Sequence, residues 1–247
     1  MLSALVLDLD DTLVDHTSAA GAAIVSWAQE LGLETLNPQA CWAEISAFHY
    51  ARYQRSELTF AQQRRERVRG FLGRELDDQG ADACFDDYLA RYEAAWRAYD
   101  DVVPALRRAR TAGLRVGVLT NGDAEQQRAK VDRLDLAPRI DVLVASSDLP
   151  AGKPDPTAFR HITDLLGTAP EDTLMVGDSL TDDVLGALAA GLQAVLLDRH
   201  DRHRSVDVRR ISSLDELLRD PLDGTTDLDE NRPMARPLTP PTPRANS

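Results

Sequence analysis

The sequence is poor in the features that mark secreted, membrane-spanning or disulfide-rich proteins. It has two cysteines, Cys41 and Cys84, in 247 residues, too few and too far apart for a disulfide framework or a zinc site. No apolar run approaches the roughly 20 residues of a membrane span. The short apolar run near the N-terminus has no basic flank of the kind that marks a signal peptide. We therefore expect a cytoplasmic protein.

Basic residues are also scarce. Lysine and arginine number 28 against 41 aspartates and glutamates, which gives a formal net charge of −13. This balance argues against a general surface for nucleic acids or anionic membranes. A small phosphate ester remains possible as a substrate, because a bound metal ion and one lysine can reverse the field locally.

An acidic motif directly follows the first apolar run. Residues 4–14 are ALVLDLDDTLV, and the run at 5–7 predicts a strand buried on both faces, as in a parallel sheet. Asp8 and Asp10 are two residues apart, so in an extended chain they point to the same side. Two such carboxylates at a strand end suggest a hard divalent cation, Mg2+. The alternative is a solvated turn in which Asp10 or Asp11 caps the next segment.

The next part of the chain, residues 15–100, has helical periodicity. It holds all three tryptophans and all five tyrosines, and aromatic stripes at helical spacing are more often core than ligand-binding. Four helices are expected, over 17–31, from Pro38 with Asn37 as cap, over Thr59–Phe71 with a Thr59–Gln62 capping box, and over about 81–99. The run RRERVR, residues 64–69, is expected to form a solvated helix face, unless it lines the site and contacts an anionic substrate.

After Val102 the pattern changes to strands that alternate with helices. Strands are expected at 114–119, 141–145, 173–176 and 194–197, which predicts βαβ units and a parallel sheet. We expect an α/β core from residues 1–14 and 101–220. The helical block 15–100 interrupts this core and can act as a lid. Residues 221–247 hold few apolar side chains and are expected to be disordered.

Four of the predicted strands lead into polar segments. Residues at the carboxyl ends of adjacent parallel strands converge on one crevice. The converging side chains are Asp8 and Asp10; Thr120 and Asn121; Lys153; and Asp178 with Asp182 and Asp183. Carboxylates for a metal ion, with a lysine and a hydroxyl for the remaining oxygens, suit a phosphoryl group.

The segments DLDDT, LTNG, GKPDP and GDSLTDD resemble, in order and spacing, the four motifs of the haloacid dehalogenase-like (HAD) hydrolase superfamily. The resemblance spans residues 4 to about 219. It implies a Rossmann-like α/β core with an inserted all-helical C1 cap. Within the superfamily the chain looks most like the pyrimidine nucleotidases and N-acylneuraminate-9-phosphatase.

The resemblance also implies residue roles. Asp8 matches the nucleophile that forms an aspartyl-phosphate, and Asp10 matches the general acid/base. The Asp8 carboxylate, the Asp10 backbone carbonyl and the Asp178 side chain match the Mg2+ ligands.

Further matches concern the phosphate and the outer shell of the metal. Thr120 and Asn121 match the phosphate-binding second motif, and Lys153 matches the third. The outer-shell acid of the fourth motif matches Asp183 or Asp182, of which we favour Asp183.

These features favour a Mg2+-dependent phosphomonoester hydrolase acting on a nucleotide or sugar phosphate. A haloacid dehalogenase of the same fold would lack the second aspartate of the first motif, so Asp10 argues against it. A sugar-phosphate mutase would keep the same motifs, and a catalytically silent binding protein would not need them. The motifs specify neither the substrate nor the oligomeric state.

Overall fold

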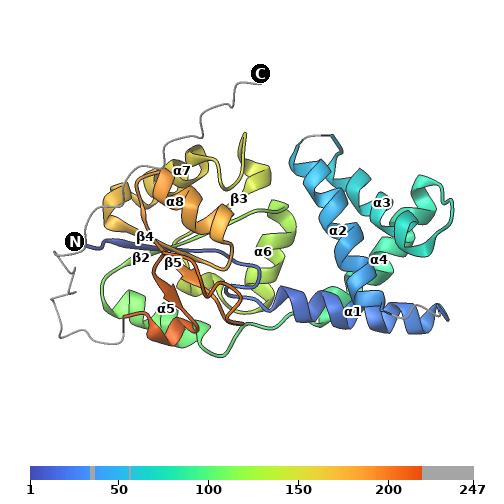
Figure 1. Cartoon of the computed structure of the whole chain (residues 1–247), viewed down its shortest axis with the longest axis horizontal. Coiled ribbons are helices and arrows are strands. Elements are labelled where there is room, and N and C mark those ends of the chain that lie inside the picture. The colour runs from blue at the N-terminus through green and yellow to red at the C-terminus, as the bar shows by residue number, and fades with distance from the viewer. Residues whose placement is uncertain (34–36, 56, 219–247) are drawn as a thin grey trace, which may run out of the picture.

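A six-stranded parallel sheet forms the α/β part of the molecule (Figure 1). The computed structural model describes residues 1–33, 37–55 and 57–218, and the tail predicted over 221–247 lies outside them. The sheet order is β3-β2-β1-β4-β5-β6. The strands are β1 (Ala4–Leu7), β2 (Arg115–Thr120), β3 (Val142–Ala145), β4 (Thr173–Gly177), β5 (Gln193–Leu197) and β6 (Arg210–Ile211).

The central strand is β1, as its unbroken apolar run predicts. All four of its residues are buried, because β2 and β4 flank it and helices cover both faces. Leu7 lies opposite Val118 of β2 and Val176 of β4. This register brings the carboxyl ends of the three strands to one edge of the sheet.

Two apolar clusters cover the two faces of this sheet. One contains Leu106 of α5 (Val102–Thr111) and Val131 of α6 (Ala124–Arg133). The other contains Phe159 and Ile162 of α7 (Pro156–Leu166) and Ala187 of α8 (Gly186–Ala189). The result is the three-layer arrangement that alternating strands and helices predict.

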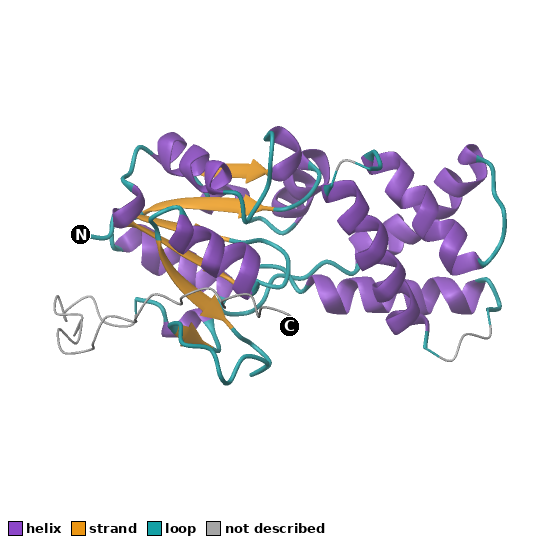
Figure 2. Cartoon of the chain, turned by 45° about the horizontal axis from the view of Figure 1, so that its top comes forward, coloured by secondary structure: helices purple, strands orange, loops and turns teal. Residues whose placement is uncertain are grey.

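Four helices lie between β1 and α5 in the sequence and form a helical insert beside the carboxyl end of the sheet (Figure 2). They are α1 (His16–Glu30), α2 (Pro38–Gln54), α3 (Phe60–Leu72) and α4 (Asp78–Ala94). Asn37 caps α2, and the capping box of Thr59 and Gln62 is present at α3, so both predicted helix starts are confirmed.

The insert has an aromatic core of its own. Trp27 is 1% exposed, lies parallel to Phe71 with ring centroids 5.7 Å apart, and meets Trp42 edge-on at 6.2 Å. This core explains why the tryptophans and tyrosines gather in one stretch of the sequence, and it confirms that most of them are packing residues.

The predicted fourth helix is displaced at both ends. It begins at Asp78, with Asp77 as its cap, and it ends at Ala94. The chain leaves the helix before Tyr99 because its backbone pairs with the outgoing segment: Asp15 N–H donates to Arg97 O at 3.0 Å, and Tyr99 N–H donates to Leu13 O at 3.1 Å. The two chain crossings between sheet and insert therefore lie side by side.

The described helices were also considered as membrane spans. Among them, none combines the length and the apolar character that crossing a bilayer requires.

The aromatic core predicts where the insert is sensitive to mutation. We expect Trp27→Ala to lower the free energy of unfolding by roughly 3–5 kcal/mol, because a cavity replaces the buried ring. Phe48→Ala, at a side chain 61% exposed, should change it by less than about 0.5 kcal/mol. Urea unfolding followed by far-UV circular dichroism measures both, and equal small losses would contradict a packed aromatic core.

Candidate active site

The backbone turns sharply after β1 and fixes the first acidic motif. Asp8 N–H continues the pairing with β4 by donating to Val176 O at 3.0 Å. Asp11 then adopts a φ of +60°, in the left-handed region that aspartate tolerates better than most residues. Its carboxylate accepts hydrogen bonds from the Thr17 N–H and hydroxyl at 2.8 and 2.7 Å. Asp11 therefore ties the turn to the start of α1.

A lysine lies between two buried carboxylates at the sheet edge. Lys153 Nζ donates to Asp8 Oδ1 and to Asp183 Oδ1, each at 2.6 Å, and all three side chains are at least 90% buried. Asn121 positions the lysine's backbone: it accepts from Lys153 N–H at 2.9 Å and donates to Lys153 O at 2.8 Å. The second and third motifs are thus held together by one amide side chain.

Asp8, Asp178 and Asp183 form the acidic cluster of the site, with one oxygen from each lying within 4.8 Å of the others. Asp183 also accepts from Ser179 N–H at 2.9 Å. Burial raises the pKa of Asp8 well above its usual value, Lys153 opposes this, and the neighbouring carboxylates add to it. Burial and Asp183 raise the pKa of Asp178 to about 7.

These pKa shifts indicate that Lys153 does not offset all the negative charge of the acidic cluster. Carboxylate oxygens at this spacing are the donors that Mg2+ prefers, and a divalent cation would favour the ionised form of each carboxylate. The donor set therefore fits a hard metal ion.

Asp10 is held by a second lysine. Lys130 Nζ, 1% exposed, donates to Asp10 Oδ1 at 2.5 Å. Gln127 bridges Asp10 Oδ2 and Thr120 Oγ1 by donating to them at 2.9 and 2.8 Å. Burial alone would raise the pKa of Asp10, but Lys130 and His16 outweigh it and lower this pKa to about 2.

The sequence reasoning did not single out Lys130 or Gln127. They lie three residues apart on the helix that follows the LTNG segment, so they share one helix face. The signal in the sequence was this spacing of three residues on the helix that follows Thr120 and Asn121. It could have indicated that Gln127 and Lys130 face the site.

The structure brings most of the expected residues together. Asp8, Lys153, Asp178 and Asp183 meet directly, whereas Thr120 reaches Asp10 through Gln127. Asp182 is half-buried and is not part of the acidic cluster. Its backbone N–H donates to Ser179 Oγ at 3.1 Å.

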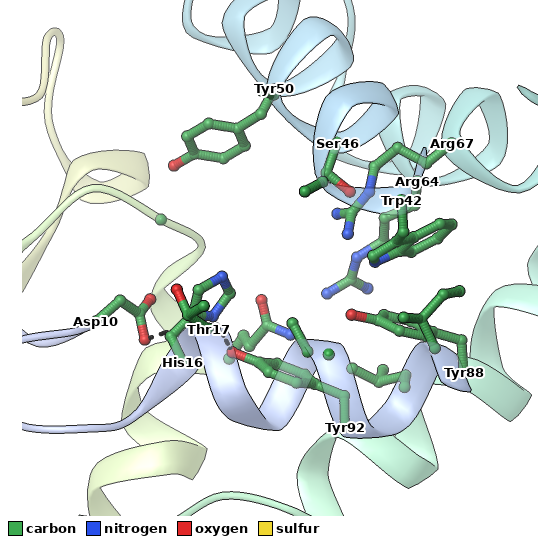
Figure 3. Close-up of a pocket in the computed structure, with 18 of the residues that line it drawn as sticks. Asp10, His16, Thr17, Trp42, Ser46, Tyr50, Arg64, Arg67, Tyr88 and Tyr92 are labelled. Carbon is green, nitrogen blue, oxygen red and sulfur yellow. Dashed lines mark hydrogen bonds and ion pairs between the residues drawn. The ribbon is translucent and has the colours of Figure 1, made fainter. Parts of the chain in front are cut away.

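A cavity of about 880 Å³ separates the sheet edge from the helical insert (Figure 3). Asp10 and Asn121 line it from the sheet, and Tyr50, Arg64 and Arg67 are among the residues that line it from the insert. The expectation of a solvated face over residues 64–69 is therefore wrong for Arg64 and Arg67. One turn of helix directs these two to the cavity, while their neighbours make ion pairs outside it.

Comparison with known proteins gives the family. The family model for haloacid dehalogenase-like hydrolases matches residues 2–191. A phosphoserine phosphatase from Thermus thermophilus is 32% identical over 241 residues, covering 83% of this chain and 94% of the relative. The N-acylneuraminate-9-phosphatase of Mus musculus is 40% identical over 97 residues, which is 39% of each chain. The chain belongs to the haloacid dehalogenase-like hydrolase family, as its motifs predicted.

A solved structure shares the fold. The HAD-hydrolase YfnB from Bacillus subtilis, bound to magnesium, aligns with a TM-score of 0.73 at 21% identity, covering 88% of this chain and 97% of that chain. At this identity the likeness concerns the fold alone, and it confirms the predicted α/β class.

The acidic cluster depends on the absence of a side chain at Gly177. A Cβ there would lie 2.1 Å from Asp183 Oδ2, so Gly177→Ala must displace Asp183 from Lys153. We expect a loss of about 1–3 kcal/mol in the free energy of unfolding from overpacking. Gly70→Ala on α3 is the matched control. Its Cβ would come no closer than 3.4 Å to Ile45, and it should stabilise by about 0.4–1 kcal/mol.

Denaturant unfolding of both glycine variants gives the comparison. A neutral effect of Gly177→Ala would contradict the tight approach of Asp183 to the strand.

Proposed function

We propose that the protein is a Mg2+-dependent phosphomonoesterase that acts on a small phosphorylated metabolite, a nucleotide or sugar phosphate, through an aspartyl-phosphate on Asp8. The observation that carries this proposal is the Asp8 carboxylate held by Lys153 inside an acidic cluster at the strand ends. The phosphatase names of its relatives, among them phosphoserine phosphatase, agree with it.

Asp8 is the proposed nucleophile. A carboxylate attacks a dianionic phosphate poorly because like charges repel, so positive charge must offset the repulsion. The Lys153 ammonium, 2.6 Å from Asp8 Oδ1, both orients the nucleophile and can bind a phosphate oxygen. The covalent route divides hydrolysis into two transfers, each easier than direct attack by water.

Asp10 is the proposed acid and base. In the free protein the Lys130 ammonium keeps it ionised, with a pKa of about 2, so it is ready to deprotonate the water that cleaves the aspartyl-phosphate. Its earlier role, protonating the leaving alkoxide, requires that it first takes up a proton. A phosphate ester with a second pKa of about 6 does not protonate a carboxylate whose pKa is about 2, so this role requires that substrate binding first raises the pKa of Asp10.

Mg2+ would be held by the carboxylates of Asp8 and Asp178 and by the Asp10 backbone carbonyl, with Asp183 as the outer-shell acid. Bound there, it would neutralise charge on the phosphate. Asp183 is preferred over Asp182 because it is 1% exposed and bonded to Lys153. Thr120 and Asn121 would complete the phosphate site.

Residues 15–100 are the proposed cap and substrate-selecting unit, over a core of residues 1–14 and 101–220. The support is that, among the residues that the structure describes, the chain passes between the two parts at two adjacent crossings, where Val14 pairs with Ala98. The cavity between the two parts is where a substrate would be enclosed and screened from water.

The two carboxylates of the first motif should respond differently to amidation. Asp8→Asn should abolish turnover on every substrate. Asp10→Asn should slow alkyl phosphates by about 10²–10⁴-fold, because their leaving group needs a proton. The leaving group of p-nitrophenyl phosphate is nitrophenolate, a stable anion that needs no proton. With this ester the variant should release a burst of about one nitrophenolate per site and then stall. Rapid-mix kinetics would record the burst.

Asp11→Asn is the matched control for this pair. Asp11 neighbours Asp10 but bonds to Thr17, so this variant should turn over without a burst. Steady turnover of both substrate types by Asp10→Asn at the parent rate would refute its proposed role.

The metal site makes a separate prediction. Activity of metal-stripped protein should return with Mg2+ and much less with Ca2+, whose looser coordination suits in-line transfer poorly. Asp183→Asn should weaken Mg2+ binding about 10–100-fold, as loss of outer-shell partners typically does. Asp182→Asn, the adjacent carboxylate outside the acidic cluster, should weaken it less than threefold. Calorimetric titration with Mg2+ measures both, and full activity in chelator would rule the site out.

A further inference from the structure

Arg64 and Arg67 carry positive charge on the cavity wall formed by the helical insert, opposite the sheet edge. Both belong to α3, three residues apart, and Figure 3 shows Asp10 on one side of the cavity and the two guanidinium groups on the other. The phosphate chemistry proposed above does not use them.

Their immediate neighbours are aromatic rings. Arg64 lies over Phe60 and Phe85, with its guanidinium carbon 4.1 and 4.9 Å from the ring centroids. Arg67 lies over Trp42 at 4.7 Å. These cation–π contacts orient the guanidinium planes.

Neither guanidinium is neutralised by a carboxylate. Within residues 1–33, 37–55 and 57–218, no acidic oxygen comes within the 4.0 Å of an ion pair to either group. Arg67 donates one long hydrogen bond of 3.4 Å from Nη1 to Gln63 Oε1, and its Nε is buried with no partner among the same residues.

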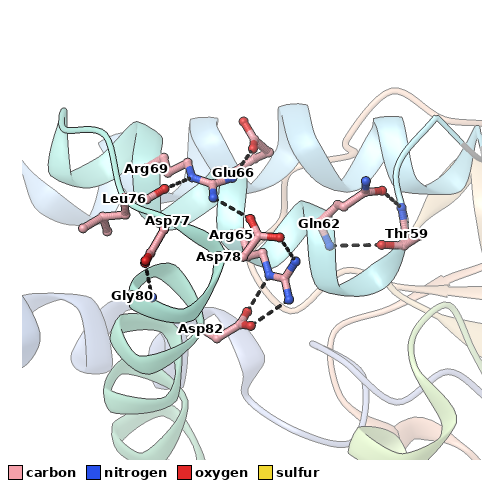
Figure 4. Close-up of polar contacts among 10 residues, drawn as sticks. All are labelled: Thr59, Gln62, Arg65, Glu66, Arg69, Leu76, Asp77, Asp78, Gly80 and Asp82. Atoms are coloured by element: carbon pink, nitrogen blue, oxygen red, sulfur yellow. Dashed lines mark hydrogen bonds and ion pairs between the residues drawn. The ribbon is translucent and has the colours of Figure 1, made fainter.

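The neighbouring arginines of the same helix show the contrast (Figure 4). Arg65 donates to Asp82 at 2.7 Å and to Asp78, and Arg69 donates to Glu66 and Asp78 at 2.7 Å each. The helix therefore pairs the arginines that point outward and leaves unpaired the two that face the cavity.

Two unpaired guanidinium groups in an aromatic surrounding are electrostatically costly. Burial lowers the pKa of both, and carboxylates at longer range, Asp123 foremost, oppose this shift for Arg64 without cancelling it. The two positive charges also disfavour each other. An anion bound between them would offset both the cost of burial and the mutual repulsion, and it would accept charge-assisted hydrogen bonds.

We propose that Arg64 and Arg67 bind a second anionic group of the substrate, a carboxylate or a second phosphate, at the end remote from the scissile phosphate. This proposal rests on the phosphomonoesterase function above and narrows its substrate class to phosphate esters with two separated anionic groups. Tyr88 and Tyr92 also line the cavity, so the body between the two groups meets aromatic walls. The cavity, about 880 Å³, is of the size that typical ligands occupy.

The test uses three esters that share a phenyl leaving group. They are 4-ethylphenyl phosphate, 4-(carboxymethyl)phenyl phosphate and 4-(phosphonomethyl)phenyl phosphate, which differ in the charge of the remote substituent. Wild-type protein with Mg2+ should show kcat/KM at least about tenfold higher for one charged ester than for the ethyl ester, since hydrogen bonds to charged groups contribute this much or more. Which charged ester gains more tells a carboxylate from a phosphate.

Substitutions on α3 test whether the two arginines cause the preference for the charged ester. Arg67→Gln and Arg64→Gln should each reduce the ratio of charged to ethyl ester about tenfold, and Arg67→Lys should restore part of it. Arg65→Gln, which removes the same charge outside the cavity, should leave the ratio unchanged. Melting temperatures of all variants monitor folding. A ratio near one in wild type, or an equal fall on all three esters in the variants, would overturn the subsite.

Binding measured without turnover separates this proposal from the phosphatase mechanism. In the Asp8→Asn background, calorimetry should give a Kd for the charged ester about tenfold lower than for the ethyl ester, and Arg67→Gln should remove the difference. Hydrolysis of all esters with no difference in Kd would refute the subsite alone. Absence of hydrolysis in wild type, with the difference in Kd intact, would refute the proposed function and leave an anion-binding site supported.

Discussion

The buried Lys153 ammonium between Asp8 and Asp183 is the interaction on which the site depends. Its two 2.6 Å contacts require three separate parts of the chain to meet: the end of β1, the helical segment Leu180–Leu185 after β4 and the loop after β3. Removing Lys153 would leave the two buried carboxylates uncompensated, at a cost of about 3–5 kcal/mol. Ion pairs of this kind are weak evidence for stability, but this one holds the proposed nucleophile, a cation and a second carboxylate in one geometry.

The sheet and the helical insert place charged groups on opposite sides of the cavity between them. The sheet places Asp10 at one side of the cavity, and Asp8, Asp178 and Asp183 gather at the same edge of the sheet. The insert places Arg64 and Arg67, which form no ion pair with any residue that the structure describes, at the other side. Between them, Lys130 and Gln127 keep Asp10 in a defined ionised state. The two arginines at the remote side would favour a substrate with a second anionic group over esters that lack one.

Much of the fold and most of the candidate site could be predicted because they rest on local patterns. An apolar run followed by Asp8 and Asp10 marks a buried strand and its end, and the capping box of Thr59 and Gln62 marks a helix start. The end of α4 could not be predicted in the same way. Backbone pairing of Tyr99 with Leu13, distant in sequence, terminates the helix where local periodicity continues.

The sequence by itself determined the fold family, the residue types at the strand ends and the order in which they occur, because strand and helix periodicity and short motifs are local properties. Only the tertiary structure decided which lysine serves which carboxylate: Lys153 pairs with Asp8 and Lys130 with Asp10. It also decided that Arg64 faces the cavity while Arg65 pairs outside it. A charged residue has no preferred partner in the sequence, since its electrostatic energy depends on distance and burial, and both arise only when remote segments pack together.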